Sequence, residues 1–567
     1  MSIAEIKNHF QLPIDFSTNK KKVLDNIYTD LELLKSTNNK PFYHFLFEPK
    51  TKAGEVIVEK WAENYTSDSK FLEDSQKIYK KFDIQNKNSL CDKTWDMWNK
   101  TKLDKGFIEK YQFIDMNHFK WLNESAIFLF ILSFYSIVSP LLNLLAPLII
   151  LLIPFIILKI MKVPVNAASY TKVLLEQLDK HSFGQLFTRF TQVSTSQKMY
   201  LLMCFGMYVY NIYQSVVSCH QFYSNTYFIN EYFDNFKDYL SNTKNNLKKY
   251  VAIINPLKSY QKYKKYIVEK QNDLETLYNT VVSIPRVSPN PLLFKNMGFV
   301  MKQFYLMNTS KNIENLLFFS FGFNGYIDTM EGLCNKINNK TLNNAVFTDK
   351  ASIKIKDNYY PLIKGKIIKN DIKIKNNIII TGPNAAGKTT LLKSTILNVL
   401  ITQQLGVGFY KTIKINPFDF IYCYLNIPDT SGRDSLFQAE ARRCKEILST
   451  IELNKNERHF CIFDELYSGT NPYEAIASAY SYLNVISNNK NVTFMLTTHF
   501  IKLCQLFKKT DRIENYNMKT LMVHDKPTYT YKIKKGISQI KGGVSVLQNL
   551  GYPQKIINKT MEILKIL

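Results

Sequence analysis

The sequence predicts an α/β domain at the C-terminal end of the chain, preceded by a largely α-helical region. Three observations predict this fold class. From about Asp349 onward, strand-like and helix-like patterns alternate, which is typical of a parallel sheet with crossover helices. Before that point, apolar residues mostly recur at helical spacing. A nearly charge-free segment, Ala126 to Ile160, interrupts the helical part.

The composition fits a folded protein of several domains. The chain has 567 residues, of which 46% are hydrophobic, so it can bury a large core. Its net charge of +26 suits DNA or an anionic membrane surface, although the Lys, Asn and Ile bias of an AT-rich genome would produce the same excess. The eight scattered cysteines predict a reducing compartment and no structural zinc. Residues 1–20 lack the layout of a cleavable signal, so we expect no secretion.

Residues 1–123 form the first predicted region, which is polar, rich in aromatic residues and mostly helical in periodicity. Residues 124–163 follow as an apolar stretch with Pro140 and Asn143 near its middle. Because one bilayer-spanning helix needs about 20 apolar residues, we predict an apolar transmembrane hairpin here, or one tilted span with a re-entrant piece. The alternative is a hairpin that is buried inside a large helical domain.

Lysines flank the apolar stretch on both sides, at Lys120, Lys159 and Lys162, and match the positive-inside tendency. We therefore expect a membrane-associated protein whose C-terminal domain lies on the cytoplasmic side. A weaker apolar run, Tyr200 to Val217, contains polar residues and is predicted to be a core helix rather than a further span.

Residues 164–345 are predicted to form a helical core or lever domain. One helix there places six apolar or aromatic residues on one face: Tyr260, Tyr263, Ile267, Leu274, Leu277 and Val281. Aromatic residues between lysines can bind single-stranded nucleic acid, but a packed helix with a solvated basic face is the simpler interpretation.

Residues 346–535 are predicted to form the α/β domain, and a phosphate-binding loop is its clearest motif. Gly382 to Thr389 fills every position of G-x-x-x-x-G-K-[ST], between an apolar strand and an amphipathic helix. Lys388 would reach the β- and γ-phosphates of ATP, and the Thr389 hydroxyl would ligate Mg²⁺. ATP and Mg²⁺ are therefore the predicted cofactors. The loop residues expected to bind the nucleotide are Gly382, Pro383, Asn384, Ala385, Ala386, Gly387, Lys388, Thr389 and Thr390.

Two later strands end in residues that are suited to hydrolysis. The first ends in Asp464-Glu465: Asp464 can hold Mg²⁺, and Glu465 can orient and polarise the attacking water. The second ends in Thr498-His499, where the histidine can contact the γ-phosphate. Together these residues predict an enzyme that hydrolyses ATP.

A helix that starts at Ser435 lies between the phosphate-binding loop and the first of these strands. Ser435 and Gln438 form a capping-box pattern, and a serine at a helix N-terminus attracts an anion. Because the loop at 382–389 already encloses the ATP of its own subunit, the expected target is the γ-phosphate that a second subunit binds. The sequence therefore predicts a dimer held together by ATP.

These motifs resemble those of the MutS family, the clamp ATPases of DNA mismatch repair. The stretches TGPNAAGKTTLL, SGRDSLFQAE, FDELYSGTNPYEA and LTTHF are similar to the family's phosphate loop, trans-acting signature, Mg²⁺/water motif and switch histidine. Residues 536–567 resemble its helix-turn-helix dimerisation end, with Gly551 at the turn and Pro553 in the next helix. The resemblance is specific over about 345–567, diffuse over 166–345 and absent before that.

The resemblance implies a MutS-like P-loop ATPase domain of ABC type. It implies catalytic roles for Lys388, Glu465 and His499, Mg²⁺ binding by Thr389 and Asp464, and contact of Ser435 with the partner's nucleotide. It also implies DNA as a partner and a homodimer or a heterodimer with a paralogue.

Three departures from the family pattern are visible. Phe71 and Glu73 have the letters of the family's Phe-x-Glu mismatch wedge without its context, and Ile367 stands where an aromatic residue usually stacks on adenine. A membrane segment is foreign to the repair enzymes. We therefore predict a membrane-tethered DNA clamp in repair, recombination or genome maintenance. The alternative is a membrane-embedded ABC-type mechanical ATPase that does not act on DNA.

Overall fold

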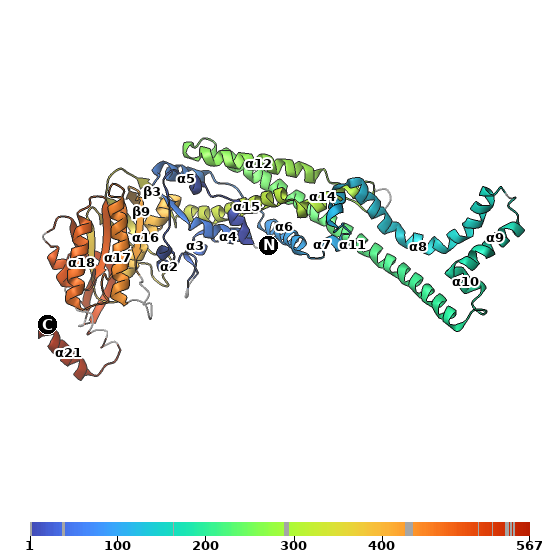
Figure 1. The fold of residues 1–567 in the computed structure, drawn as a ribbon. Coiled ribbons are helices and arrows are strands. Elements are labelled where there is room, and N and C mark those ends of the chain that lie inside the picture. Colours follow the sequence, from blue (N-terminus) through green and yellow to red (C-terminus); the bar gives the residue numbers. More distant parts are fainter. Residues whose placement is uncertain are drawn as a thin grey trace. The chain divides into compact units, whose positions relative to one another are not determined.

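The computed structural model describes most of the chain. The described residues are 3–36, 40–162, 164–288, 294–425, 435–508, 510–523, 526–538, 544, 547 and 550–566. Apart from Met1, the chain folds as two compact units. The first comprises Leu90–Asn242 and Asp273–Leu317. The second comprises Ser2–Ser89, Thr243–Asn272 and Phe318–Leu567, so the N-terminal segment belongs to the unit that contains the α/β domain (Figure 1).

The first unit is built from helices. Those that lie almost wholly within it are α6 (Asn88–Leu103), α7 (Phe107–Lys110), the 3-10 helix η3 (Asn117–Glu124), α8 (Ala126–Ile160), α9 (Ala167–Lys180), α10 (Ser182–Thr188) and α14 (Met297–Thr309). Parts of three longer helices complete it: α11 (Thr195–Ile254), α12 (Gln261–Val282) and α15 (Lys311–Asn338). Phe304 centres its aromatic core, with ring centroids 5.6 Å from Phe107 and 5.1 Å from Tyr232.

The apolar segment forms one helix instead of the hairpin predicted within 124–163. Residues 126–160 are the continuous helix α8, which bends near its middle (Figure 1). Pro140, Pro147 and Pro154 each lack a backbone N–H, which bends a helix without ending it. No glycine, the residue that most readily adopts the left-handed backbone of a tight turn, occurs between residues 126 and 160.

The run Tyr200 to Val217 is not a core helix. It belongs to the N-terminal half of α11, and most of its large apolar side chains are exposed, among them Leu202, Met207 and Val209. The prediction was wrong because apolar composition does not tell whether the rest of the protein covers a helix.

The helix α12 packs as the simpler interpretation predicted. All six residues of the predicted face are buried: Tyr260, Tyr263, Ile267, Leu274, Leu277 and Val281. Lys262 and Lys265 are exposed on the other side. The aromatic residues are therefore core residues and are not available to stack on nucleic-acid bases.

The N-terminal segment of the second unit, Ser2–Ser89, is mostly helical, and the structure thus divides the predicted region 1–123 between the two units. This segment contains α1 (Ile6–His9), α2 (Asp25–Asp30), α3 (Phe42–Phe47), α4 (Lys52–Trp61) and α5 (Ser69–Lys81), with β1 (Lys20–Lys22) paired antiparallel to β2 (Asn64–Thr66). Phe71 on α5 is buried, and its ring stacks on Tyr260 with centroids 5.0 Å apart. Phe71 is thus a packing residue, which agrees with setting it aside as a mismatch wedge.

The predicted α/β domain contains two sheets. A six-stranded sheet has the order β13-β12-β6-β11-β10-β9, and all its neighbours are parallel except β12 and β13. Its strands are β6 (Asn377–Thr381), β9 (Phe420–Tyr424), β10 (His459–Asp464), β11 (Val492–Thr498), β12 (Ile513–Val523) and β13 (Lys526–Lys535). A five-stranded sheet, β5-β4-β8-β3-β7, consists of β3 (Asn343–Phe347), β4 (Ile353–Asn358), β5 (Asn370–Ile374), β7 (Val407–Gly408) and β8 (Thr412–Ile415).

Four helices follow strands of the domain: α16 (Lys388–Leu405), α17 (Leu436–Leu453), α18 (Pro472–Ser487) and α19 (Ile501–Leu506). The strand register pairs Asp464 with Thr497 and Thr498 with Thr381. Because these strands are parallel, the carboxyl ends of β6, β10 and β11 meet at one edge of the sheet. Ligands bind at this edge in open α/β sheets.

The C-terminal region is described in part. Gly551 has a left-handed backbone (φ +74°), and the Tyr552 N–H donates to the Leu547 carbonyl at 3.1 Å, as in a helix-ending turn. The last helix, α21 (Gln554–Ile566), begins directly after Pro553. The turn predicted at Gly551 is present. Most of the predicted preceding helix lies outside the described residues, and the dimerisation role stays a prediction.

Strand β9 lies at the edge of the six-stranded sheet, and side chains of the N-terminal segment cover its backbone. The Tyr65 hydroxyl donates to the Asp419 carbonyl and accepts from the Ile421 N–H, both at 3.1 Å. Asn26 donates to the Cys423 carbonyl. An unpaired sheet edge is a site for unwanted strand addition, and these contacts close it.

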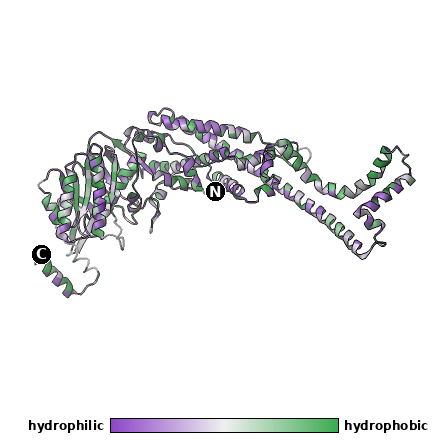
Figure 2. Cartoon of the chain, in the orientation of Figure 1, coloured by the Kyte–Doolittle hydropathy of each residue, from purple (hydrophilic) through white to green (hydrophobic). Residues whose placement is uncertain are grey.

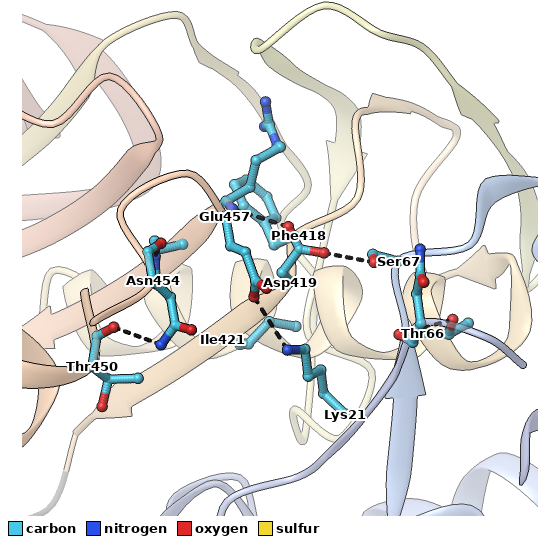
Figure 3. Close-up of polar contacts among 12 residues, drawn as sticks. Lys21, Thr66, Ser67, Phe418, Asp419, Ile421, Thr450, Asn454 and Glu457 are labelled. Carbon is cyan, nitrogen blue, oxygen red and sulfur yellow. Dashed lines mark hydrogen bonds and ion pairs between the residues drawn. The ribbon is translucent and has the colours of Figure 1, made fainter. Parts of the chain in front are cut away.

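Further polar contacts join the N-terminal segment to the same edge (Figure 3). Ser67 donates to the Asp419 carboxylate at 2.7 Å, and Lys21 pairs with Glu457 at 3.2 Å. Asp30 accepts from the Leu425 N–H at 3.2 Å, at the end of β9. The N-terminal segment is therefore an integral part of the second unit.

Replacing Tyr65 with phenylalanine is expected to lower the free energy of unfolding by about 1–3 kcal/mol, because the Ile421 N–H loses its acceptor in a buried position. Urea denaturation of the full chain measures this change. Tyr473→Phe is the matched control, because Tyr473 is 80% exposed, and it should leave stability unchanged. Equal stabilities of Tyr65→Phe and the wild type would show that the hydroxyl does not close this edge.

Candidate active site

The loop after β6 forms a tight turn that leads directly into α16. Ala385 (φ +62°) and Gly387 (φ +89°) both adopt left-handed backbone conformations. A Cβ on Gly387 would lie 3.0 Å from the Tyr531 ring, so glycine is required there for space as well as for conformation. Because α16 starts at Lys388, its unpaired N–H groups face the loop. Such a turn binds phosphate groups.

The Lys388 ammonium is held inside this turn. The residue is only 5% exposed, and its Nζ donates to the carbonyl oxygens of Gly382 at 3.1 Å and Pro383 at 3.4 Å. Burial lowers the pKa of Lys388, while the carboxylates of Glu465 and Asp464 oppose this effect. A cation that is held with so little water is well placed for an anionic ligand.

Asp464 is fixed by two hydroxyl groups, one from the first turn of α16 and one from the carboxyl end of β11. The Thr389 hydroxyl donates to Asp464 Oδ2 at 2.7 Å, and the Thr497 hydroxyl donates to Oδ1. A carboxylate and a threonine hydroxyl are the oxygen ligands that Mg²⁺ prefers. The structure thus brings together the two residues that were predicted to bind the metal.

Glu465 and His499 lie in direct contact at the same edge. His499 Nε2 is 2.8 Å from Glu465 Oε1 and 3.0 Å from Lys388 Nζ. The hydrogen bond from His499 lowers the pKa of the Glu465 carboxyl, and the positive charge of Lys388 acts in the same direction. Because Nε2 carries at most one proton, it cannot donate to Glu465 and accept from Lys388 at the same time. His499 is therefore positioned to alternate between these two partners.

Glu465 also has an unusual backbone. Its φ of +55° lies in the left-handed region, although it is not a glycine, and its N–H donates to the Thr497 carbonyl at 3.0 Å. Such conformations cost about 1–3 kcal/mol each and concentrate at functional sites. With this backbone conformation, the Glu465 side chain does not follow the alternating direction that it would have if β10 continued.

A pocket of about 510 Å³ opens next to the loop. Seven of the residues predicted for the site line it: Asn384, Ala385, Gly387, Lys388, Thr389, Thr390 and Glu465. Gly382 and Pro383 contribute carbonyl groups to Lys388, and Ala386 is buried behind the loop. Six of the predicted loop residues and the Glu465 carboxylate therefore share one cavity.

Comparison with known proteins identifies this domain. The profile of the family MutS domain V matches residues 378–567. Residues 378–567 belong to the MutS family. Relatives named "DNA mismatch repair protein MutS" are similar to this chain: that of Persephonella marina is 28% identical over 247 residues, and that of Bacteroides fragilis is 30% identical over 252 residues.

The similarity covers part of each protein. Each of these two alignments spans 42% of this chain, and they span 28% and 29% of the respective relatives. The chain therefore covers less than a third of the length of these curated relatives. The resemblance inferred from the motifs is confirmed for MutS domain V.

Ser435 starts α17 of MutS domain V, as its capping-box pattern predicted. Its hydroxyl accepts from the Gln438 N–H at 3.3 Å, and Gln438 Oε1 accepts from the Ser435 N–H at 3.0 Å. Among the described residues, Ser435 is not part of the lining of the phosphate pocket of its own chain. Residues 426–434, which include the first part of the signature motif, lie outside the described residues.

Glu440 is a site residue that the sequence analysis missed. It is only 2% exposed, and its carboxylate accepts from the Ser468 N–H at 3.1 Å and the Gly469 N–H at 3.2 Å. Glu440 thereby joins the helix that begins at Ser435 to the segment that follows Glu465. Glu440 is a charged residue at helical spacing between the apolar residues Leu436 and Cys444, and this pattern could have revealed it.

Tyr531 is a second missed residue of MutS domain V. It lies on β13, lines the pocket and contacts Gly387, and Asn370 donates to its carbonyl at 2.9 Å. Ile367, which stands at the expected adenine-stacking position, does not line the pocket among the described residues. Tyr531 lies more than 140 residues after Gly387 in the chain, so no local motif indicated that it belongs to the pocket.

Proposed function

We propose that this chain is a Mg²⁺-dependent ATPase whose MutS domain V binds and hydrolyses ATP and controls a clamp on DNA. The observation that carries the proposal is the convergence of Lys388, Asp464 and Glu465 at one strand edge, beside the left-handed turn at Gly387. These residues supply, respectively, a buried cation, an oxygen ligand set and a strained carboxylate. This is the combination that phosphoryl transfer to water requires.

The residues present fit ATP and Mg²⁺. A pocket of about 510 Å³ lies beside the loop and is lined by Lys388 and Thr389, so a ligand can approach the loop closely. Bound Mg²⁺ would neutralise charge on the phosphates, with Thr389 and Asp464 as its protein ligands. Tyr531 offers a ring against which the base would pack.

Glu465 orients and polarises the water in this proposal. The hydrogen bond from His499 lowers the pKa of the Glu465 carboxyl, which favours its ionised form. Lys388 binds the phosphates and leaves its contact with His499 when it does so. His499 then reports the state of the phosphate site through its bond with Glu465.

A second subunit completes the site in the proposed dimer. Ser435 lies at the N-terminus of a helix and does not line its own pocket among the described residues, so its hydroxyl is available to the nucleotide of a partner. A second copy of the chain or a paralogue would supply this contact.

DNA is the proposed macromolecular partner. The relatives are named as DNA mismatch repair proteins, and the net charge of +26 favours a polyanion. Recognition of mismatches is not part of the proposal, because the chain covers less than a third of those relatives.

Purified full-length protein tests both parts of the proposal. Lys388→Met should abolish ATP binding and turnover, whereas Lys445→Met, on the exposed side of α17, should leave both unchanged. DNA affinity should fall by about 10³–10⁵ between 50 and 200 mM salt if the protein contacts roughly 6–10 phosphates. ATP turnover without DNA binding at low salt would favour the mechanical ATPase that does not act on DNA. Full turnover by Lys388→Met would refute the assigned site.

A further inference from the structure

The helices α8 and α11 of the first unit share an unusual composition. Residues 125–158 and 199–230 contain no Asp, Glu, Lys or Arg. The segment Ala126–Leu145 has a mean hydropathy of 2.0 and is long and apolar enough to cross a membrane by length and composition. Figure 2 shows that hydrophobic residues extend along most of α8. Two uncharged stretches of similar length thus lie on two different helices.

The two helices are antiparallel neighbours. Asn143 Nδ2 on α8 donates to Ser215 Oγ on α11 at 2.6 Å, and the Tyr208 hydroxyl donates to the Asn143 carbonyl at 2.8 Å. Cys219 Sγ approaches the Ile137 carbonyl at 3.9 Å. The printed contacts join residues 137–144 of α8 to residues 208–219 of α11. Beyond its bend, α8 leads to α9 instead, and the Tyr170 hydroxyl of α9 donates to the Leu151 carbonyl at 2.6 Å (Figure 1).

The polarity of α8 is inverted relative to that of a helix in a water-soluble protein, whereas α11 exposes both apolar residues and the polar Asn211 and Gln214. The hydroxyl-bearing residues Ser133, Ser136 and Ser139 on α8 are buried. Large apolar side chains point outward instead: on α8 Ile131 (60% exposed), Leu144 (58%) and Leu152 (59%), and on α11 Met203 (54%), Met207 (55%) and Tyr213 (61%). Only 22% of the apolar window within Ala126–Leu145 is buried. Buried hydrogen-bonded polar groups with apolar groups outside are expected where the surroundings are hydrocarbon.

We propose that α8 and the N-terminal half of α11 together form a two-helix anchor in a lipid bilayer. The 20 residues of Ala126–Leu145 would extend about 30 Å as a helix, which equals the thickness of the hydrocarbon core. Exposed Trp121 lies near the start of the first stretch and exposed Tyr227 near the end of the second, as aromatic residues do at membrane interfaces. The anchor thus differs from the hairpin expected within 124–163, because its second helix comes from α11. It does not depend on ATP or DNA binding.

Vesicle flotation tests the anchor. The full chain should float with phosphatidylcholine vesicles, and the double variant Leu152→Glu/Met203→Glu should reduce the bound fraction by about tenfold or more, because charges are unfavourable in hydrocarbon. Both side chains are exposed, so the variant should fold and melt like the wild type. Leu453→Glu is the matched control: Leu453 is 84% exposed on α17 and should not affect flotation.

Native cysteines give a second readout. Among the described residues, only Cys204 and Cys219 are not buried, and both lie on α11. A water-soluble maleimide, followed by mass spectrometry, should label Cys204 at least tenfold more slowly in vesicle-bound wild type than in the double variant in buffer. Absence of flotation, or rapid Cys204 labelling in floated protein, would overturn the anchor. A wild-type dimer that the double variant disrupts without any flotation would instead assign the surface to a second copy.

Discussion

Replacing Glu465 with glutamine is expected to lower kcat for ATP hydrolysis by about 10²–10⁴-fold while ATP affinity changes little. Glutamine keeps the size of the side chain but lacks the negative charge that His499 and Lys388 stabilise. It cannot polarise the attacking water as a carboxylate does, whereas the contacts of Lys388 and Thr389 with phosphate and metal would remain. Steady-state phosphate release and equilibrium binding of a fluorescent ATP analogue measure the two quantities.

Glu452→Gln is the matched control for this variant. Glu452 is an exposed residue on α17, so its neutralisation should leave both kcat and ATP affinity as in the wild type. Hydrolysis by Glu465→Gln at the wild-type rate would show that another group activates the water. Loss of ATP binding by the variant would mean that Glu465 serves mainly to hold the loop.

Mixing two inactive variants is expected to restore ATP hydrolysis if each subunit completes the site of the other. Ser435→Asp keeps a good helix cap but places a negative charge against the partner's γ-phosphate. Lys388→Met removes phosphate binding in its own chain. In a random mixture of equal amounts, half of the dimers hold one intact site, so activity should return to about a quarter of the wild-type value.

Ser435→Asn separates the charge from the cap. Asparagine also caps helices but is neutral, so this variant should retain more activity than Ser435→Asp at equal thermal stability. If the mixture stays inactive although the two variants form dimers, Ser435 does not contact the partner's nucleotide. Activity of Ser435→Asp on its own would lead to the same conclusion.

The sequence predicted the turn at 382–389 and the acids beside it because their signals are local. The turn from Gly382 to Thr389 requires glycine and lysine at fixed spacing, and the acids at 464 and 465 directly follow an apolar strand. Parallel pairing then brings these strand ends together without further information. Tyr531 could not be predicted in this way, because only the tertiary fold places β13 beside Gly387.

Contacts between distant segments left no periodic pattern to detect. Tyr65 and Ile421 are 356 residues apart, and the hydrogen bond between them joins a side-chain hydroxyl to a backbone N–H. Any residue except proline at position 421 could offer this N–H, so the residue type there carries no signal. The bend of α8 was also ambiguous in the sequence, because proline signals both a kink and the end of a helix. In both cases, the surroundings of the segment decided its structure.

The covered edge of β9 affects how MutS domain V would behave as an isolated fragment. The family match begins at residue 378, whereas Asn26, Asp30 and Tyr65, which occupy that edge, lie far upstream. A fragment cut at the family boundary would leave a bare strand with free amide and carbonyl groups. Such a fragment would tend to self-associate and precipitate. A soluble fragment that contains this domain is therefore expected to need Ser2–Ser89 or a substitute for them.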